Sequence, residues 1–372
     1  MEWFISFGCL LLLAAIVLSI AALIVATQKS DDSGNVPDNG GGVIVPEFVR
    51  PFNVYAFGDS YNDPGNLWIL SPETIENATD PIFPVPDPSG TIVPVVSKQR
   101  FGPNHTNSNG LLAHNFLATQ FGLKHYLGFA QTQVPRRNRI FVDYSISGAQ
   151  QGGSDYLLAN QPPPSVEFQV RTFAQQLAAS GKAIRDLDVF ILRTVGGNEF
   201  PNMAAAIILQ GADPAQLLAT FVGQLVTNLT LLYQAGARNV MLEVFDIASV
   251  LPIYGKIVAV NPAIAIPIDQ LMAGIRDTVH TVLGAQQPIL WPQMNLQLYN
   301  MSTFRDWLTQ NAQLVGIIDN GVTISDQLDD GVTVNPNQRF WDDIHPSQKT
   351  HRLWSVFLNG YVQQLLLNRL EL

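Results

Sequence analysis

The chain is poor in cysteine and in positive charge. Cys9 is the only cysteine and lies in the apolar N-terminal segment, so the rest of the chain can form no intrachain disulfide and no thiolate metal site. The 20 Lys and Arg are outnumbered by 30 Asp and Glu, which gives a formal net charge of −10 at pH 7. No basic stripe could neutralise a run of phosphates, so nucleic acid is not expected as a partner. Stability must come from packing, for which an apolar fraction of 47% is sufficient.

The N-terminal end is an uncharged apolar segment. Residues 3–26 carry no charged side chain, and as a helix they would rise about 36 Å, enough to cross a hydrocarbon core of roughly 30 Å. We expect residues 1–27 to enter a membrane, either as a signal anchor or as a signal peptide cleaved near Ala26. Residues 28–47 are rich in Gly, Asp, Asn and Pro and are expected to form a disordered linker.

The side of the membrane on which the remaining chain lies depends on two opposing signals. Lys29, just after the apolar segment, would favour a cytosolic domain by the positive-inside rule. Sequons for N-glycosylation favour the secretory lumen and occur at Asn77, Asn104, Asn228 and Asn300. Because a single lysine is a weak signal, we expect a membrane-anchored protein with a luminal or extracellular domain, or a secreted protein.

Residues 48–372 are expected to form one domain, since neither a repeat nor a second linker follows. Short apolar runs alternate there with helical stretches, and strands are expected at 53–58, 139–145, 188–194, 239–245 and 288–291. The clearest helix has Asp213 as N-cap, Pro214 in its first turn and Gly236 at its end. This alternation predicts a three-layer α/β/α sandwich, flavodoxin-like, around a mainly parallel five-stranded sheet. Function in such sheets gathers at the carboxyl ends of the strands.

The first predicted strand runs directly into GDSYNDPGN at 58–66. A small residue before Ser60 and turn formers after it would expose the hydroxyl at a strand end, where it could attack a ligand. A serine in a polar turn is more often a cap or a turn residue, so the letters GDS alone do not establish a nucleophile.

A second polar cluster, FWDDIHPS, lies at 340–347. Pro346 fits the first position of a helix continuing to about Tyr361, which would place His345 at its N-terminal edge. The positive helix end disfavours an imidazolium, whereas Asp342, folded back onto the other ring nitrogen, favours it. These effects would balance in a histidine that serves as a base. The alternative is that Asp342 and Asp343 cap the helix and His345 is a surface histidine.

Two further loops contain groups that could stabilise an oxyanion. Gly148 in SISGA (145–149) could present its backbone N–H closely because it has no side chain. The amide of Asn198 in GGNE (196–199) could donate from the other side. Either loop alone could equally be an ordinary turn after a strand.

Taken together and in this order, the four blocks GDSYNDPGN, SISGA, GGNE and DDIHP resemble the GDSL, or SGNH, esterase/lipase family. NSNG at 107–110, GARNV at 236–240 and FWDDIHPSQKTHR at 340–352 are similar to its lipase-like acylhydrolase branch, and the resemblance covers roughly residues 52–365. It implies a serine ester hydrolase with Ser60 as nucleophile, His345 as base and Asp342 as the acid that orients the base. It also implies an oxyanion hole formed by the backbone N–H of Ser60, by Gly148 and by Asn198.

Two positions depart from the family pattern. Glu199 stands where the family usually has Asp, and Tyr61 replaces the usual Leu after the nucleophile. Neither removes a group needed for bond breaking. The mechanism implied by the resemblance requires no metal, nucleotide or redox cofactor. None is expected, since the sequence lacks the motifs GxxxxGK, GxGxxG and HExxH. The GxSxG motif of the other large hydrolase family is also absent. The expected partners are an ester substrate, either a lipid or an acylated glycan, and the membrane reached by residues 3–26.

Three alternatives remain open. The same chemistry could act as a glycan O-acetylesterase in place of an esterase for lipid or small acyl esters. The domain could also be a catalytically inactive, membrane-tethered binding protein that uses the fold as a scaffold. In an acyltransferase, finally, the same residues would pass the acyl group to an acceptor alcohol in place of water.

Overall fold

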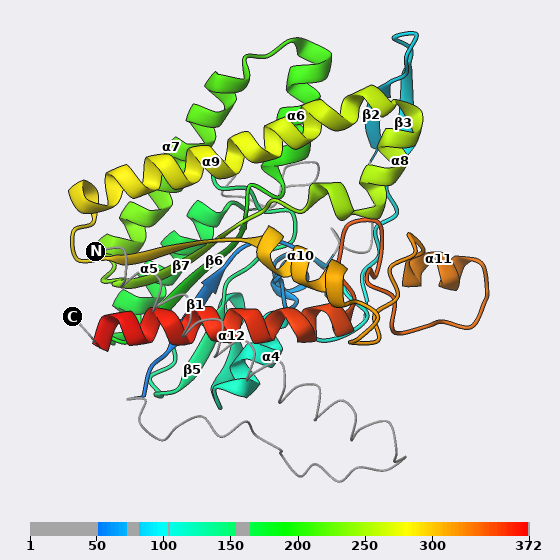
Figure 1. Cartoon of the computed structure of the whole chain (residues 1–372). Helices are drawn as coiled ribbons and strands as arrows, with labels where there is room; N and C mark the ends of the chain where they lie inside the picture. The colour runs from blue at the N-terminus through cyan, green and yellow to red at the C-terminus, as the bar shows by residue number, and fades with distance from the viewer. Residues whose placement is uncertain (1–50, 73–81, 103–104, 154–163, 371–372) are drawn as a thin grey trace, which may run out of the picture.

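The computed structural model describes residues 51–72, 82–102, 105–153 and 164–370. The predicted membrane segment, the predicted linker and the sequons at Asn77 and Asn104 lie outside the described residues. Figure 1 shows the described chain as a sheet with helices on both of its faces.

The central sheet has six strands in the order β4-β5-β1-β6-β7-β8. All neighbouring pairs are parallel. The strands are β1 (Val54–Phe57), β4 (Lys124–Leu127), β5 (Ile140–Asp143), β6 (Val189–Val195), β7 (Asn239–Val244) and β8 (Asn295–Asn300). The predicted three-layer α/β/α class is therefore confirmed, with one strand more than expected. Both edge strands, β4 and β8, escaped prediction because they are only partly buried and do not read as continuous apolar runs.

The strand expected at 288–291 is wrong. Residues up to 290 belong to α9 (Ala265–Leu290), which contains Pro288 near its end, and β8 begins only at Asn295. Ile289 is 73% exposed, so this apolar run is the outer end of a helix and not a buried strand. Periodicity cannot assign an apolar run of four residues to a helix or a strand, and residues 288–290 belong to a helix.

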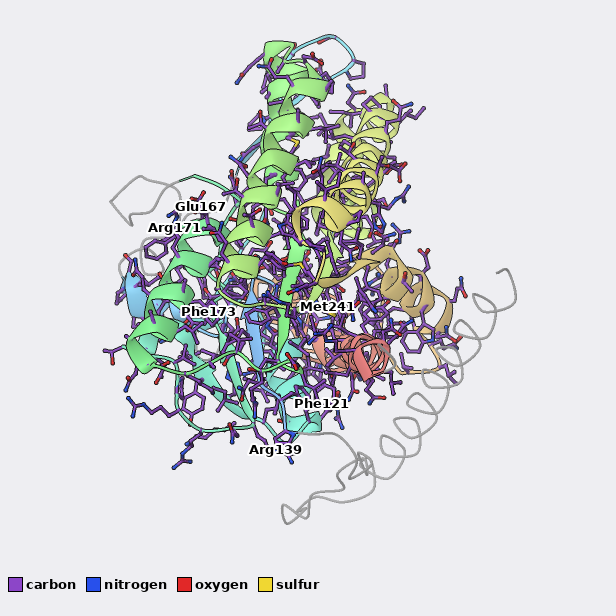
Figure 2. All side chains as sticks on the ribbon, turned by 90° about the vertical axis from the view of Figure 1, so that its left-hand side faces the viewer. Phe121, Arg139, Glu167, Arg171, Phe173 and Met241 are labelled. Atoms are coloured by element: carbon purple, nitrogen blue, oxygen red, sulfur yellow. The ribbon has the colours of Figure 1, made fainter. Side chains whose placement is uncertain are left out.

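Alternate residues of the strands point to opposite faces and fill two separate cores. Tyr55 and Phe57 of β1 face α5 (Val166–Ser180), α7 (Pro214–Gln234) and α9. Val54 and Ala56 face the other layer, which contains α4 (Ala113–Gln120), α10 (Met301–Asn311) and α12 (Gln348–Leu370). Figure 2 shows the same division within α5, where Phe173 points towards the sheet while Glu167 and Arg171 lie on the outer side.

Helix α7 confirms the prediction for its segment. Asp213 is the N-cap and accepts a hydrogen bond from the N–H of Ala215 at 2.9 Å, and the helix ends two residues before Gly236. By length and composition α7 could span a membrane. Its apolar stripe is nevertheless buried against the sheet at Phe221, Val222, Leu225, Leu229 and Leu232. In this fold α7 is therefore a core helix.

Helix α12 begins later than expected. Its first residue is Gln348, whereas Pro346 forms an isolated antiparallel bridge with Phe340. His345 is thus held in a loop that precedes the helix and is not at the helix edge itself. Since the field of a helix end fades within about one turn, the orientation of His345 must come from direct contacts.

A smaller group of elements stands beside the sheet. It comprises α6 (Glu199–Gln210), the antiparallel hairpin β2 (Ile82–Pro86) and β3 (Ile92–Val96), α8 (Pro252–Val260), the 3-10 turns η3 (Ala248–Val250) and η4 (Pro262–Ile264), and the start of α9. We call this group the cap (Figure 1). The remaining short elements are α2 (Asn66–Leu70), η2 (Gly128–Ala130) and α11 (Ile324–Asp329).

Candidate active site

Ser60 follows the carboxyl end of β1, a central strand of the sheet. The turn is fixed at Gly58, whose N–H and C=O both bond to the side-chain amide of Gln169 from α5, at 3.0 and 2.8 Å. A Cβ on Gly58 would lie 2.8 Å from Nδ2 of Asn62 and 3.1 Å from the carbonyl oxygen of Arg193. Only glycine fits this close approach of chain segments, and it sets the place of Ser60 at the strand end.

The acidic residue three positions after Ser60 organises the neighbouring loops. The carboxylate of Asp63 accepts hydrogen bonds from the N–H of Gly65 at 2.9 Å and of Ser147 at 2.8 Å. Asn66 donates to the carbonyl oxygens of Asp143 and Ser145. The block at 58–66 therefore fastens the loop after β5 beside Ser60. The sequence signals both segments but not that Asp63 joins them.

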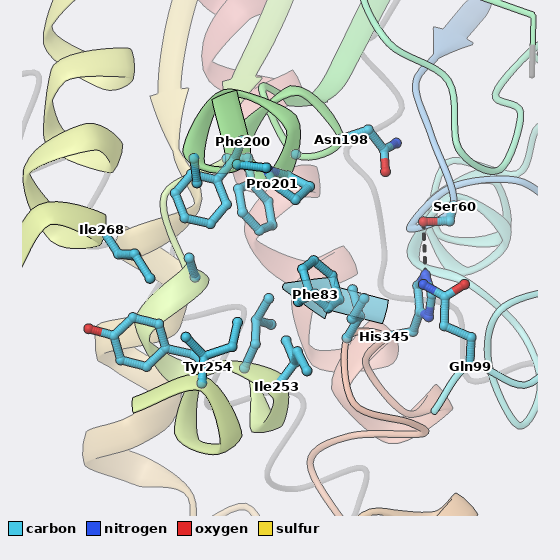
Figure 3. A pocket seen from close by; sticks show the side chains of 18 of the residues that line it. Ser60, Phe83, Gln99, Asn198, Phe200, Pro201, Ile253, Tyr254, Ile268 and His345 are labelled. Atoms are coloured by element: carbon cyan, nitrogen blue, oxygen red, sulfur yellow. Dashed lines mark hydrogen bonds between the residues drawn. The ribbon is translucent and has the colours of Figure 1, made fainter. Parts of the chain in front are cut away.

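Three side chains form one hydrogen-bonded chain. Oγ of Ser60 lies 2.9 Å from Nε2 of His345 (Figure 3). Nδ1 of His345 lies 2.9 Å from each carboxylate oxygen of Asp342. His345 and Asp342 are buried, and Ser60 is 8% exposed. The structure thus brings together the three residues singled out in the sequence, in the order Ser60, His345 and Asp342.

Asp342 is held by the backbone as well as by His345. Oδ1 also accepts the N–H groups of Ile344 and His345, at 2.9 and 2.8 Å, and Oδ2 accepts the N–H of Arg100 at 3.1 Å. Every one of these bonds restrains the carboxylate. Its plane is therefore set before any ligand arrives.

Asp343 points away from the imidazole. Oδ2 accepts the backbone N–H of Lys98 at 2.7 Å and the ammonium of Lys256 at 2.6 Å. Burial raises the pKa of Asp343 even though Lys256 opposes this effect. Asp343 is thus a link to Lys98 and to α8, and of the two aspartates Asp342 is the one that contacts the His345 ring.

Both departures from the family pattern have structural partners. The hydroxyl of Tyr61 donates to the carbonyl oxygen of Ile344 at 2.7 Å, which braces the loop that carries His345. The carboxylate of Glu199 accepts the N–H of Gln151, and burial raises the pKa of Glu199 to about 7. Neither side chain replaces a member of the Ser60 hydrogen-bonded chain.

Asn198 lies between the loop after β1 and the loop after β5. Its Nδ2 donates to Oδ2 of Asp59 at 3.3 Å and to the carbonyl oxygen of Ala149 at 2.9 Å. Gly148, next to Ala149, has a positive φ of 80°, which glycine adopts readily. Asn198 is therefore adjacent to the neighbours of both Ser60 and Gly148. Because both of its N–H groups face protein acceptors, donation to an oxyanion requires the longer bond, to Asp59, to open.

A cavity opens directly onto Ser60 and His345 (Figure 3). Its volume is about 130 Å³. The polar groups Asp59, Gln99 and Asn198 lie with Ser60 and His345 at one end. The remaining lining is mainly apolar, and most of it comes from the cap. Nothing in the sequence predicted this cavity, because its lining is scattered over residues 59–345.

A buried Ser-His-Asp chain at the carboxyl edge of a parallel sheet is the arrangement of a serine hydrolase. The model of the GDSL-like lipase/acylhydrolase family matches residues 54–355. The chain therefore belongs to this family of ester hydrolases.

Two further comparisons give more distant likenesses. Over 207 residues the chain is 24% identical to a GDSL esterase/lipase of Arabidopsis thaliana, and the match covers 55% of this chain and 53% of that protein. The chain thus spans about half the length of this relative. The crystal structure of NanS aligns over 87% of this chain and 100% of its own at 11% identity, with a TM-score of 0.32. This last likeness is too low to support an argument.

The two adjacent aspartates are expected to differ sharply in their effect on turnover. Asp342→Asn should lower kcat by orders of magnitude, on the scale of the roughly 10⁴-fold loss in a serine-protease triad, because His345 loses the negatively charged partner that fixes its tautomer and stabilises its imidazolium. Asp343→Asn should lower kcat far less. The measurement is kcat on one soluble ester, with circular dichroism to confirm folding of both variants. A larger loss in Asp343→Asn would place the triad acid one residue later.

Proposed function

We propose that the protein hydrolyses carboxylic esters through an acyl-enzyme on Ser60. The observation that carries this proposal is the hydrogen-bonded chain from Ser60 through both ring nitrogens of His345 to Asp342. A serine hydroxyl is a weak nucleophile unless a neighbouring base removes its proton and a third group orients that base. His345, 285 positions after Ser60, supplies the base, and Asp342 supplies the group that orients it.

In the first half of the reaction, Oγ of Ser60 attacks the ester carbonyl carbon and its proton passes to Nε2 of His345. Asp342 stabilises the imidazolium that forms. When the tetrahedral intermediate collapses, the bond to the alcohol oxygen breaks and Nε2 returns the proton to the leaving alcohol. In the second half, water attacks the acyl-enzyme with the same proton transfers, which releases the acid and restores Ser60.

The oxyanion formed in each half requires N–H donors. We assign this role to the backbone N–H groups of Ser60 and Gly148 and to the side-chain amide of Asn198. The contacts of Asn198 with Asp59 and Ala149 support this assignment, since Asp59 is the neighbour of Ser60 in the chain and Ala149 is the neighbour of Gly148. Charge that develops on the carbonyl oxygen would attract the N–H that Asp59 holds at 3.3 Å in the free protein.

The other functions considered have less support. A catalytically inactive binding protein would have no use for a base held within hydrogen-bonding distance of Ser60. An acyltransferase would use the same residues, and added alcohol would then divert the product from acid to ester. A glycan O-acetylesterase shares the chemistry but would leave the apolar part of the cavity empty.

The nucleophile can be tested by covalent labelling. A fluorophosphonate probe should label the full chain once, because attack by Oγ of Ser60 displaces fluoride, and Ser60→Ala should abolish both labelling and hydrolysis of p-nitrophenyl acetate. Ser89→Ala, which alters an exposed serine in the β2–β3 turn, serves as control and should retain both. Labelling that persists in Ser60→Ala would refute the assignment.

The oxyanion hole can be tested at Asn198. Asn198→Ala should lower kcat by about 10²-fold or more with little change in KM, since the donor acts on charge present mainly in the transition state. The thermal unfolding temperature should change little. A variant that mainly raised KM while keeping kcat would make Asn198 a substrate-binding residue.

We further propose that the domain faces the secretory lumen or the cell exterior, held there by residues 3–26 or released after their cleavage. The sequons support this placement. Among those described, Asn228 is buried and its amide donates to the carbonyl oxygen of Gln151, while Asn300 accepts a hydrogen bond from His280. Asn77 and Asn104 are therefore the expected acceptors.

This placement predicts a shift in gel mobility when protein from a eukaryotic secretory host is treated with an N-glycosidase. The double variant Asn77→Gln and Asn104→Gln should remove most of the shift, whereas Asn228→Gln should leave it unchanged. Wild-type protein whose mobility does not respond to the glycosidase would contradict luminal placement.

A further inference from the structure

The cavity beside Ser60 is polar at one end and apolar along the rest of its length. Beyond the catalytic end, the cap supplies aromatic and aliphatic side chains from separate elements: Phe83 and Val85 from the hairpin, Phe200, Pro201 and Ile208 from α6, Ile253 and Ile257 from α8, and Ile264 and Ile268 from η4 and α9. Tyr254 also lines the cavity, but its hydroxyl bonds elsewhere, to the carbonyl oxygen of Ala265 and the carboxylate of Asp269. An apolar group that enters here meets no competing polar partner in this described part of the wall.

Helix α6 keeps the cavity open. Pro201, Ala204, Ala205 and Ile208 follow the three- and four-residue spacing of one helix face, and all four line the cavity. Two positions in the middle of this face are alanine, the smallest side chain that a helix accommodates without loss of stability. The space beyond their methyl groups is therefore available to a ligand. A large side chain at either position would occupy it.

We propose that this cavity binds the acyl chain of the substrate and that the protein selects esters of long-chain fatty acids. This inference rests on the proposed function, because it concerns the group transferred to Ser60. Each methylene buried in such a wall strengthens binding by roughly fourfold. An acetyl group would reach only the catalytic end, so discrimination should grow with chain length.

The acyl chain, and not the alcohol, is the group assigned to the cavity. The acyl group stays attached to Oγ of Ser60 through both halves of the reaction, and the cavity opens directly onto that atom (Figure 3). The alcohol must leave before water can enter. A group held deep under the cap would leave slowly and block the attack of water, so the cavity suits the group that remains.

The polar composition of the wall also argues against a sugar as the main occupant. Sugar hydroxyls lose hydrogen bonds to water when they are buried and require partners in the protein. In the described lining those partners are concentrated at the catalytic end, at Asp59, Gln99 and Asn198. The walls formed by α8 and by the start of α9 supply mainly methyl and methylene groups.

The test narrows the cavity from α6 with a matched control on the same helix. Ala204→Trp and Ala205→Trp place an indole in the cavity, whereas Ala206→Trp makes the same change one residue later, at a position that does not line it. For the full chain, kcat/KM is measured on p-nitrophenyl acetate, butyrate, octanoate and laurate below their solubility limits. Thermal unfolding identifies any variant that fails to fold. If Ala204→Trp or Ala205→Trp fails, Ala204→Leu is measured in its place.

The wild-type ratio of kcat/KM for laurate to that for acetate should exceed one, and Ala204→Trp and Ala205→Trp should each lower it at least tenfold. Ala206→Trp should keep the wild-type ratio. A ratio unchanged in folded Ala204→Trp and Ala205→Trp would overturn the proposal. The proposal would also be overturned if the tryptophan variants changed kcat/KM only for acetate esters of increasingly long alcohols and not for esters of increasingly long acids. Wild-type protein that neither hydrolyses acetate nor takes the fluorophosphonate would instead refute the proposed function.

Discussion

The hydrogen bond between Ser60 and His345 joins the first strand to a loop 285 residues later, and the site depends on how that loop is held. Tyr61 connects the loop directly to the turn that holds Ser60, because its hydroxyl donates to the carbonyl oxygen of Ile344 at 2.7 Å. The N–H of Trp341 donates to the carbonyl oxygen of His345 at 2.8 Å and closes the loop on itself. The residue next to Ser60 therefore helps to hold the loop that carries His345, a role that the usual leucine could not fill by hydrogen bonding.

The same loop is also fastened to the cap. The carboxylate of Asp343 accepts the N–H of Lys98, which follows the hairpin, and the ammonium of Lys256 on α8. The main-chain oxygen of Asp343 accepts the N–H of Ile253, which itself lines the cavity. If a bound acyl chain displaced α8, these bonds would transmit the displacement to Asp343, next to Asp342. The two adjacent aspartates therefore have different contacts. Asp342 bonds to the imidazole of His345, and Asp343 bonds to Lys256 of the cap.

The sequence predicted those parts of the site that depend on local order. Ser60 follows a strand, and Asp342 reaches His345 across a three-residue turn, so both relations can be read from neighbouring letters. The cavity could not be predicted, because it exists only once the hairpin, α6, α8 and α9 are brought together. The edge strands were missed for a related reason: a strand that is half exposed lacks the continuous apolar run of a central one. Pro346 suggested a helix start, but it pairs with Phe340 and the helix begins at Gln348.

Asp59, Asp63 and Glu199 are buried in the loops near Ser60, where burial of a carboxylate is unfavourable. Burial raises the pKa of Asp59 and Asp63 to about 6 and that of Glu199 to about 7. A carboxyl whose pKa is higher in the folded than in the unfolded chain favours folding below pH 4, and that contribution is lost as the pH rises through 6 to 7. Each of these acids nevertheless accepts a backbone N–H, from Tyr61, Ser147 and Gln151 respectively. These N–H groups belong to the turns that hold Ser60 and the loop after β5. The buried carboxyls thus lower stability near neutral pH but order the surroundings of Ser60 before any ligand binds.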